Sequence, residues 1–455
     1  MICTGWNTGL QIAGFPLFTI CVICQSISFL ILALCLSESC SGRPFNGGSY
    51  AITRAVVGLN AGATIGLIEV LEYIIVGVTQ LVLTSNLLQS IFNTDPSYNL
   101  AWDVGILVFS LVSNLIDGQV FWALILFYGG SCMIGMLVYL FGAWQFFDIY
   151  ANSSEVVFTF GSFVSFAQAM PYALSMFNGV EGLSLCCEET HDAQENVPKG
   201  YVSGTVFMII LFVLTYFTVI ATPQSDLFGS TFPMTDGYAL AWGIDTNDYN
   251  TSLLLILAVV PMLPSACGFT FVYARQFLAM SRSGILPEFL SLTTESTGSP
   301  YGALLFGTGL SLFLCILIRQ SSNGDDIFTV VNNTGLLLSL LNYLGQLSCY
   351  IVVRWKYAVI KHRFLSPLGI PGAVFALVVF ITTLISLVGW TDLIGWCFVV
   401  VGAWLALGFF YQKIIAKGRV ILSPEEKLAT FMYHSARFSQ MKMSNLQQKK
   451  YEVDK

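Results

Sequence analysis

Long runs of apolar residues, each about as long as a membrane is thick, recur along this chain of 455 residues. About 20 residues of helix are needed to cross a hydrocarbon core roughly 30 Å thick. Uninterrupted runs are found at about residues 15–36, 62–88, 100–116, 121–142, 202–221, 302–318, 327–353, 372–388 and 393–411. Polar loops separate these runs, and the pattern predicts an all-α polytopic membrane protein.

Three further segments are apolar but incomplete or interrupted. Residues 3–14 are too short to cross a membrane and are expected to form the second half of a span. The helix that starts at Ser162 is predicted to break at Asn178, and another span carries Pro261 and Pro264, which kink a helix. Complete and broken spans together number eleven, in addition to the half-span at the start.

The predicted break comprises Asn178, Gly179, Val180, Glu181 and Gly182 and falls near mid-membrane depth. Non-helical backbone is tolerated there only where protein covers it or where it lines a polar cavity, because lipid offers no partner for a bare N–H or C=O group. A broken helix directs one helix N-terminus and the free carbonyls of the other half toward one point, which suits a small charged or zwitterionic solute. The break therefore predicts a solute site. The alternative is a glycine kink in which a protonated Glu181 is hydrogen-bonded inside the bundle.

Two more carboxylates, Glu69 and Glu72, lie in the middle of the span at residues 62–88. They are three residues apart, so they share one face of the helix. Counted from the helix ends, they lie at about the depth of Glu181. Ionisable groups at this depth are typical of transport sites and proton relays. Capping of both carboxylates by hydroxyl groups of a neighbouring helix is the alternative.

Composition and residue spacing argue against several other classes of function. Hydrophobic residues make up 55% of the chain and charged residues 10%, and the net charge of −7 gives no basic surface for nucleic acid. His191, His362 and His434 are scattered, no Cys or His set has metal spacing, and no phosphate loop follows a strand. The stretch at residues 188–192 is expected to be a solvated acidic loop rather than a metal site. The sequence thus predicts no enzyme, no cofactor, no metal and no nucleic-acid partner.

The distribution of basic residues predicts the orientation. If residues 41–50 are cytoplasmic, 18 of the 19 Lys and Arg residues fall on the cytoplasmic side, and only Arg319 falls outside. The tail at residues 413–455 is then cytoplasmic. The glycosylation sequons at Asn152 and Asn250 fall in outside loops, which predicts that both are modified in a host that glycosylates. We expect a multi-pass protein of the plasma membrane.

The two breaks suggest an internal repeat. Breaks at corresponding positions in two halves of a membrane protein are the best indication in a sequence of a transport site at the midplane. Pairing the break near the start with the break at residues 179–182 places five helices in each half, within a transporter domain at residues 1–412. The predicted parts are a first repeat at about 1–145, a second at about 156–355, two extra helices at about 369–412 and the tail at 413–455.

Several loops carry a resemblance to a known family. Residues 43–50 read RPFNGGSY, residues 178–182 read NGVEG, Glu188-Glu189 and Pro198-Lys199-Gly200 follow, and residues 281–287 read SRSGILP. In this order and spacing, over essentially the whole chain, they resemble the amino acid, polyamine and organocation (APC) permease superfamily. Within it, residues 5–10 (GWNTGL) and 68–73 (IEVLEY) are similar to stretches of ethanolamine-type permeases.

The resemblance implies an inverted repeat of five plus five helices of the LeuT type, alternating access, and a small amino acid or amine as substrate. Glu181 would be a gating or proton-linked carboxylate, with Glu69 also in a coupling or gating role, and Glu72 would face a substrate ammonium group. The residues implied to line the substrate site are Thr4, Gly5, Trp6, Glu72, Phe177, Asn178, Gly179, Val180, Glu181 and Gly182.

Two departures from the family pattern bear on function. The first half of the first helix is missing from the sequence, and the lysine that some proton-coupled relatives carry in the fifth helix is absent from residues 121–142. H⁺ is therefore one option for the coupling ion, which stays open. The leading hypothesis is a secondary transporter, and the alternative is a transporter-like receptor or regulatory protein that moves no solute.

Overall fold

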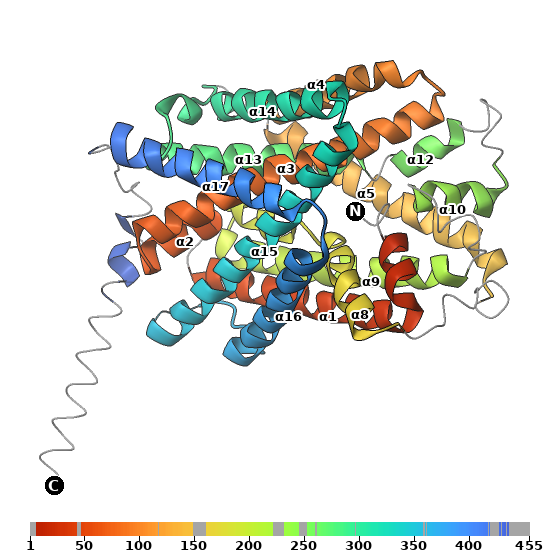
Figure 1. The fold of residues 1–455 in the computed structure, drawn as a ribbon. Helices are drawn as coiled ribbons and strands as arrows, with labels where there is room; N and C mark the ends of the chain where they lie inside the picture. The colour runs from red at the N-terminus through yellow and green to blue at the C-terminus, as the bar shows by residue number, and fades with distance from the viewer. Residues whose placement is uncertain are drawn as a thin grey trace, which may run out of the picture.

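The computed structural model describes residues 6–42, 47–116, 118–148, 161–221, 232–244, 253–259, 262–295, 297–357, 360, 362–416, 418, 427–428, 430–433 and 435. Within these residues every regular element is helical (Figure 1). In the same part of the chain, nine helices are long and apolar enough to cross a membrane. The predicted all-α polytopic architecture is therefore confirmed.

The long helices are α1 (Trp6–Gly42), α3 (Leu59–Ile91), α4 (Asn99–Leu115), α5 (Gly118–Ala143), α9 (Ala193–Ala221), α13 (Leu263–Arg282), α14 (Tyr301–Gln320), α15 (Gly324–Lys356), α16 (Gly369–Trp390) and α17 (Ile394–Phe410). The shorter helices are α2 (Gly48–Val56), α8 (Phe163–Ser175), α10 (Pro233–Trp242) and α12 (Ile256–Val259). Short 3₁₀-helices are η1 (Pro96–Tyr98), η2 (Trp144–Phe146), η3 (Val180–Cys186), η4 (Leu253–Leu255) and η5 (Glu288–Ser291), and η6 (Tyr411–Ile415) is a π-helical turn. Each of the nine uninterrupted apolar runs coincides with one of the long helices.

One predicted boundary is found in place and two differ. The label α1 covers two helical segments that meet at a break at Gly14 (φ 73°, ψ 165°), a conformation that glycine adopts without strain, and this is where the sequence placed the boundary between residues 3–14 and 15–36. The amphipathic stretch around Arg54 is a separate helix, α2, because Gly58 at φ 128° ends it before α3 begins. The proline-kinked span is divided into α12 and α13, and Pro261 lies outside the described residues.

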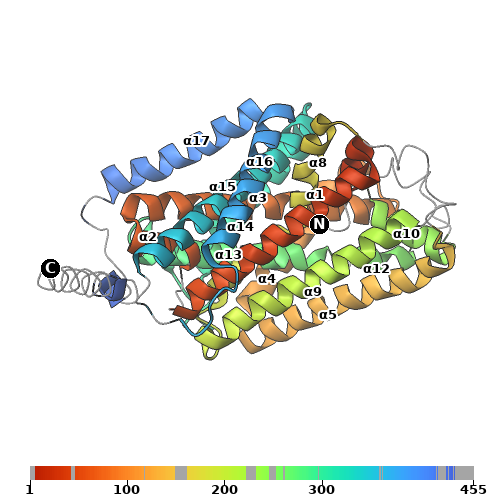
Figure 2. The same ribbon diagram turned by 90° about the horizontal axis from the view of Figure 1, so that it is seen from below.

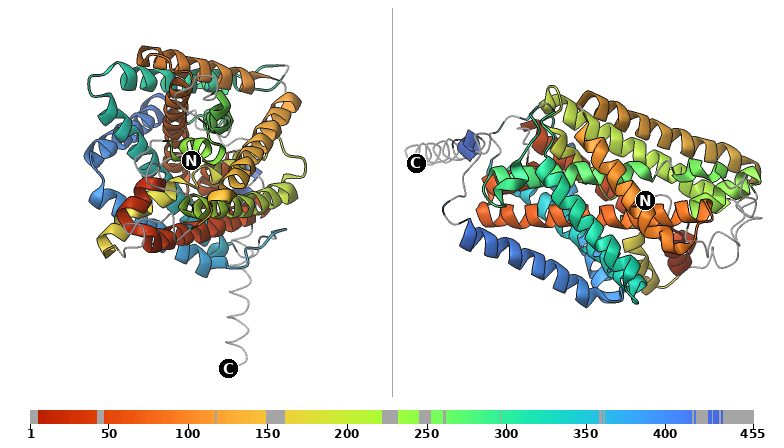
Figure 3. Two further views of the ribbon diagram at one scale, coloured as in Figure 1. Left: turned by 90° about the vertical axis from the view of Figure 1, so that its right-hand side faces the viewer. Right: turned by 90° about the horizontal axis from the view of Figure 1, so that it is seen from above.

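Helix α3 forms the centre of the bundle. In its most apolar stretch, 94% of the residues are buried, compared with 11% in the stretch at Ile394–Ile415. A helix that is apolar on all sides is stable only where other helices surround it, and α3 packs against α13 and α15. Figures 2 and 3 show α17 at the periphery, and α5 and α9 side by side on the other side of the bundle.

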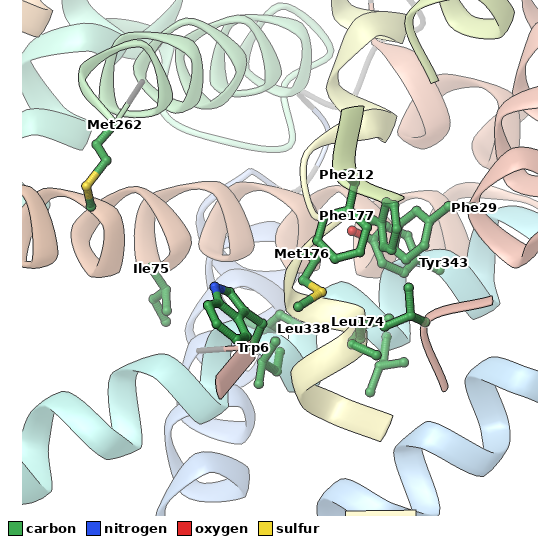
Figure 4. Close-up of a cluster of buried hydrophobic side chains, with 14 of the residues drawn as sticks. Trp6, Phe29, Ile75, Leu174, Met176, Phe177, Phe212, Met262, Leu338 and Tyr343 are labelled. Carbon is green, nitrogen blue, oxygen red and sulfur yellow. The ribbon is translucent and has the colours of Figure 1, made fainter. Parts of the chain in front are cut away.

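The break is anchored in an aromatic cluster. The ring of Phe177 stacks on Phe29 of α1 at 5.3 Å and meets Phe212 of α9 edge-on at 5.2 Å. Tyr343 of α15 meets Phe29 edge-on at 5.2 Å. Figure 4 shows these rings together, with Trp6 among side chains of α3 and α15. Burial of this much aromatic surface fixes α1, α9 and α15 around the interrupted helix.

Candidate functional site

The predicted break in the helix that begins near Ser162 is present, but it starts earlier than the sequence indicated. Helix α8 ends at Ser175, residues 176–179 form no regular helix, and the chain continues as the 3₁₀-helix η3. Gly179 has φ 102°, which a residue with a side chain adopts only under strain. The second half of the break is thus a 3₁₀-helix of seven residues rather than an α-helix.

Asn178 lies in the middle of the break and is incompletely satisfied. Its side-chain oxygen accepts a hydrogen bond of 3.4 Å from the hydroxyl of Tyr343. Its side-chain nitrogen is buried and has no hydrogen-bond partner among the described residues. An amide N–H left without a partner inside a protein costs free energy, so a bound solute that accepted this hydrogen bond would be stabilised.

A cavity of about 760 Å³, called here the polar cavity, leads to Asn178 from the side of the bundle where α3 ends and α15 begins. Helices α1, α3, α8, α15 and α16 contribute its walls. Its lining residues include many amides and hydroxyls and one carboxylate: Asn7, Thr8, Gln11, Ile12, Val76, Thr79, Gln80, Leu83, Gln168, Pro171, Tyr172, Ser175, Asn178, Phe328, Thr329, Asn332, Asn333, Leu336, Ser386, Leu387, Trp390, Thr391 and Asp392. Such a wall suits a polar, hydrogen-bonding solute.

A second cavity of about 500 Å³, the apolar cavity, lies between α5, η3, α9 and α13. Its walls are mostly aromatic and aliphatic: Tyr73, Phe121, Trp122, Ile125, Met176, Phe177, Asn178, Gly179, Val180, Gly182, Leu183, Cys186, Gly200, Tyr201, Gly204, Thr205, Met208, Ser265, Gly268, Phe269, Phe271 and Val272. Among the described residues, Asn178 is the one that lines both cavities. The break therefore separates a polar space from an apolar one.

Glu69 of α3 is buried and fully occupied by hydrogen bonds. Gln276 of α13 donates to one of its oxygens at 2.8 Å, and Gln346 of α15 donates to the other at 3.1 Å. Hydrogen bonds to a charged oxygen are stronger than those between neutral groups. These donors are carboxamides from two different helices, and the hydroxyl of Ser49 also lies against Glu69.

Glu72 is also buried, but its carboxylate accepts one hydrogen bond from a carboxamide instead of two. Asn342 of α15 donates to it at 2.8 Å, and the same Asn342 accepts a hydrogen bond of 3.0 Å from Gln346. The two carboxylates of α3 are thus linked through a chain of amides on α15. This network holds in place the face of α3 that is directed toward the break.

Glu181 differs from both. Its side chain is fully buried, and neither carboxylate oxygen has a hydrogen-bond partner among the described residues. Its backbone carbonyl accepts hydrogen bonds from Tyr201 at 2.8 Å and from Ser184 at 3.0 Å. Glu181 also lies close enough to Glu69 and Glu72 to repel both electrostatically. A buried carboxylate beside two others is costly to keep charged, and its nearest polar neighbours are the hydroxyl of Tyr343, the backbone of Gly179 and the carboxyl group of Glu72.

The other predicted site residues lie in the hydrophobic core, in the wall of the apolar cavity or outside the described residues. Trp6 is buried in the hydrophobic core and lines neither cavity, and Phe177 belongs to the aromatic cluster and to the wall of the apolar cavity. Gly179, Val180 and Gly182 line the apolar cavity. The remaining predicted residues, Thr4, Gly5, Asn152 and Asn250, lie outside the described residues.

Several site residues were missed in the sequence. Gln80, Gln168 and Asp392 line the polar cavity, and Gln276 binds Glu69. Each of the three glutamines is an isolated amide within an apolar helix, a pattern that indicates a group facing the bundle interior. Asp392 follows the end of α16, where a charged residue is ordinary at a membrane surface, so no sequence signal distinguished it.

The opposite side of the bundle, where α1, α13 and α15 end, is closed by ion pairs. Arg354 of α15 pairs with the buried Glu38 of α1, which also accepts hydrogen bonds from Tyr350 and from the backbone N–H of Ser366, each at 2.8 Å. These contacts join the end of α1 to the end of α15 and to the loop that follows it.

The acidic stretch after η3 is largely exposed, as expected for a solvated loop, and its carboxylates also form ion pairs. Glu189 forms an ion pair with Arg275 of α13, and Glu188 forms one with Arg282 at 3.4 Å. Asp192 pairs with Arg363 at 3.1 Å. We call these pairs, together with Glu38–Arg354, the ionic latch. The latch ties the continuation of the broken helix to the ends of α13 and α15.

The exception to the basic-residue pattern, Arg319, is neutralised inside the protein. Its guanidinium binds both oxygens of Asp103 of α4, at 2.8 and 3.2 Å, and donates to Asn86 of α3 at 2.7 Å and to Ser85 at 2.6 Å. Asp103 has no exposed surface. Arg319 therefore joins α14 to α3 and α4 on the side of the polar cavity.

Comparison with known proteins adds to this geometry. A family model described as "Amino acid permease" matches residues 1–415. The chain is 25% identical to the dicarboxylic amino acid permease of Saccharomyces cerevisiae over 93% of its own length and 77% of that protein. It is 24% identical to the branched-chain amino acid permease BcaP of Bacillus subtilis, over 90% and 88% of the two chains. It is 22% identical to the Asc-type amino acid transporter 1 of Mus musculus over 71% of its length, and it spans 61% of that transporter.

Proposed function

Because the chain belongs to the amino acid permease family, we propose that it is a secondary transporter that carries one small amino acid or amine by alternating access around the break at residues 176–179. It is a multi-pass integral membrane protein that transports amino acids. The observation that carries the proposal is the polar cavity of about 760 Å³, which ends at the unpartnered amide of Asn178.

The break is reached by a cavity from one side of the bundle and closed by ion pairs on the other, which supports alternating access. The polar cavity reaches the break from the end of α3, whereas the ionic latch closes the ends of α1, α13 and α15. A transporter that exposes its site to one side at a time needs a closure of this kind on the other side. In the proposed cycle the latch opens after the substrate has been bound and the polar cavity has closed.

The substrate site comprises the break and the face of α3 beside it. Asn178 supplies an N–H donor for the substrate carboxylate, and Glu72, which holds one hydrogen bond from Asn342, is the partner of the substrate ammonium group. An ammonium near a buried carboxylate reduces the cost of burying both charges. Gly179 allows the backbone to turn close to the solute.

Glu181 is the coupling group in this proposal, and H⁺ is the coupling ion. Glu181 is fully buried, its carboxylate accepts no hydrogen bond of normal geometry from the described residues, and it faces Glu72, so a proton that it bound or released would change the charge beside the solute. Glu69 holds two such bonds, from Gln276 and Gln346, so its role is to position α3. The similarity to ethanolamine-type permeases and the incomplete first helix stay predictions.

The proposed architecture is an inverted repeat with residues 1–145 and 156–355 as its halves and two additional helices at 369–412. Its support is that helices in corresponding positions contact each other: α1 packs against α8, and α3 packs against α13. The tail at 413–455 is placed in the cytoplasm and the protein in the plasma membrane. The burial of Arg319 in an ion pair supports this orientation, since a neutralised arginine is compatible with an outside location.

Uptake by the purified full-length chain in proteoliposomes tests the function. A panel of labelled amino acids and small amines is supplied with and without an inward proton gradient. We expect saturable accumulation of at least one amino acid, with competition by its unlabelled form. Saturable binding without accumulation would instead favour the non-transporting receptor or regulatory protein.

A further inference from the structure

We propose that the substrate carries no net negative charge: the permeation path accepts neutral and cationic amino acids and rejects dicarboxylic ones, and Asp392 screens them at the polar cavity. This inference rests on the proposed transport function and names the substrate class of the same site. Its basis is the charge of the residues that line the two cavities.

Asp392 is the charged residue in the wall of the polar cavity. It lies at the corner between α16 and α17, next to Leu393, whose φ of 59° marks the turn. The backbone carbonyl of Asp392 accepts a hydrogen bond of 3.4 Å from Asn333, which fixes the corner against α15. Within the described part of the chain, no Lys, Arg or His forms an ion pair with its carboxylate. Its negative charge therefore acts on whatever enters the cavity.

Beyond Asp392, the described residues add carboxyl groups to the path and no basic side chain. Among the described residues that line either cavity, none is Lys, Arg or His. Glu181 lies in η3 beside Asn178, and Glu72 and Glu69 face it from α3. Two of the partly buried arginines are already paired with carboxylates, Arg319 with Asp103 and Arg275 with Glu189.

The consequence for substrates follows from electrostatics in a narrow, weakly polar space. Clefts lined by one sign of charge concentrate ions of the opposite sign. A zwitterionic amino acid enters with its ammonium group near Asp392, and its single carboxylate finds the free N–H of Asn178. A second carboxylate on the side chain would find no cation, and burying an unpaired carboxylate is strongly unfavourable.

Uptake kinetics in proteoliposomes of the full chain test the inference, with L-alanine, L-lysine and L-glutamate as substrates and as competitors. We expect kcat/KM for glutamate to be at least about tenfold below that of the better of the other two, in line with the lower end of the effect of a charged cleft. The Asp392→Asn variant should weaken lysine uptake or lysine competition by about three- to tenfold at low salt and should weaken alanine uptake by a smaller factor, because alanine carries no net charge.

The matched control is Asp326→Asn, which removes an exposed carboxylate near the start of α15 that lines neither cavity. If both variants affect lysine equally, the effect comes from the surface charge and the role of Asp392 is wrong. If glutamate is the best substrate, the proposed substrate class is wrong.

Thermal stabilisation by the same amino acids separates the two proposals. If no amino acid is accumulated but alanine or lysine raises the Tm more than glutamate does, transport fails and the charge preference holds. A larger increase in Tm with glutamate than with alanine or lysine overturns the charge preference, whether or not uptake occurs.

Discussion

Gln276 of α13 donates a hydrogen bond of 2.8 Å to Glu69 of α3, a residue that lies 207 positions away in the sequence. Gln346 binds the other oxygen of the same carboxylate, whereas the carboxylate of Glu181 has no hydrogen-bond partner in the described residues. Two buried glutamates of one site thus have opposite surroundings, and the same substitution is expected to affect them differently.

Glu69→Gln should destabilise the protein, whereas Glu181→Gln should leave the stability unchanged or raise it. The amide of Gln at position 69 would direct its N–H₂ group at a second carboxamide N–H₂, and each lost hydrogen bond to a charged group costs about 1.5–3 kcal/mol. At position 181 the change removes a charge that has no partner to lose. The measurement is the melting temperature of both variants in the same detergent. Equal Tm losses would contradict the assignment.

Glu181→Gln should abolish coupled uptake in a folded protein. A neutral amide mimics the protonated carboxyl group but releases no proton, so a cycle that requires both protonation states stops. Wild-type uptake should increase as the outside pH falls, and any residual uptake by the variant should not respond to pH. Initial rates between about pH 5 and pH 8 measure this. Undiminished uptake in the variant would remove Glu181 from the coupling mechanism.

Arg319→Ala should be among the most destabilising single substitutions in the bundle. It leaves the buried Asp103 without a cation, and breaking a buried ion pair from one side costs about 3–5 kcal/mol. The double variant Arg319→Gln with Asp103→Asn removes both charges and should be more stable than Arg319→Ala. Thermal melting of both variants is the measurement, and a double variant with the lower Tm would contradict the account.

Glu189→Gln should open the latched side of the bundle. It removes the closer of the two carboxylates that pair with Arg275, leaving Glu188 at 4.0 Å, and Cys186, which is buried beside the latch in η3, then becomes more accessible. The measurement is the rate at which a membrane-impermeant maleimide labels Cys186, read by mass spectrometry of the labelled peptide. Lys199→Ala is the control, since it breaks the exposed Lys199–Glu195 pair, and such surface pairs contribute about 0–1 kcal/mol. Similar labelling of the two variants would argue against a latch.

The predicted orientation has its own measurement. Glycosidase treatment of the protein from a glycosylating host should increase the gel mobility of the wild type but not that of an Asn152→Gln, Asn250→Gln double variant. A glycan that remains on the double variant at a loop predicted to be cytoplasmic would reverse the topology.

Much of the helical framework could be predicted from the sequence, because crossing a membrane requires a length and an apolar composition that show directly as runs such as residues 372–388. The break was also visible, since glycines beside a glutamate are unusual in such a run. Its exact start at Met176 was not, because the aromatic packing of Phe177 decides where α8 ends.

The partners of the buried carboxylates could not be predicted. The pairing of Glu69 with Gln276 depends on which faces of α3 and α13 meet, and sequence periodicity gives no such information for helices that are buried on all sides. The paired state of Glu189 was missed for the same reason, since Arg275 reaches it only in the folded bundle.

Among the described residues, the polar and apolar cavities share one lining residue, Asn178. Tyr343 holds this side chain through a single hydrogen bond of 3.4 Å, which is long for a strong bond. A change of rotamer at Asn178 alters the walls of both cavities at once and needs no rearrangement of helices, which takes microseconds to milliseconds. The two cavities are therefore coupled through a single side chain.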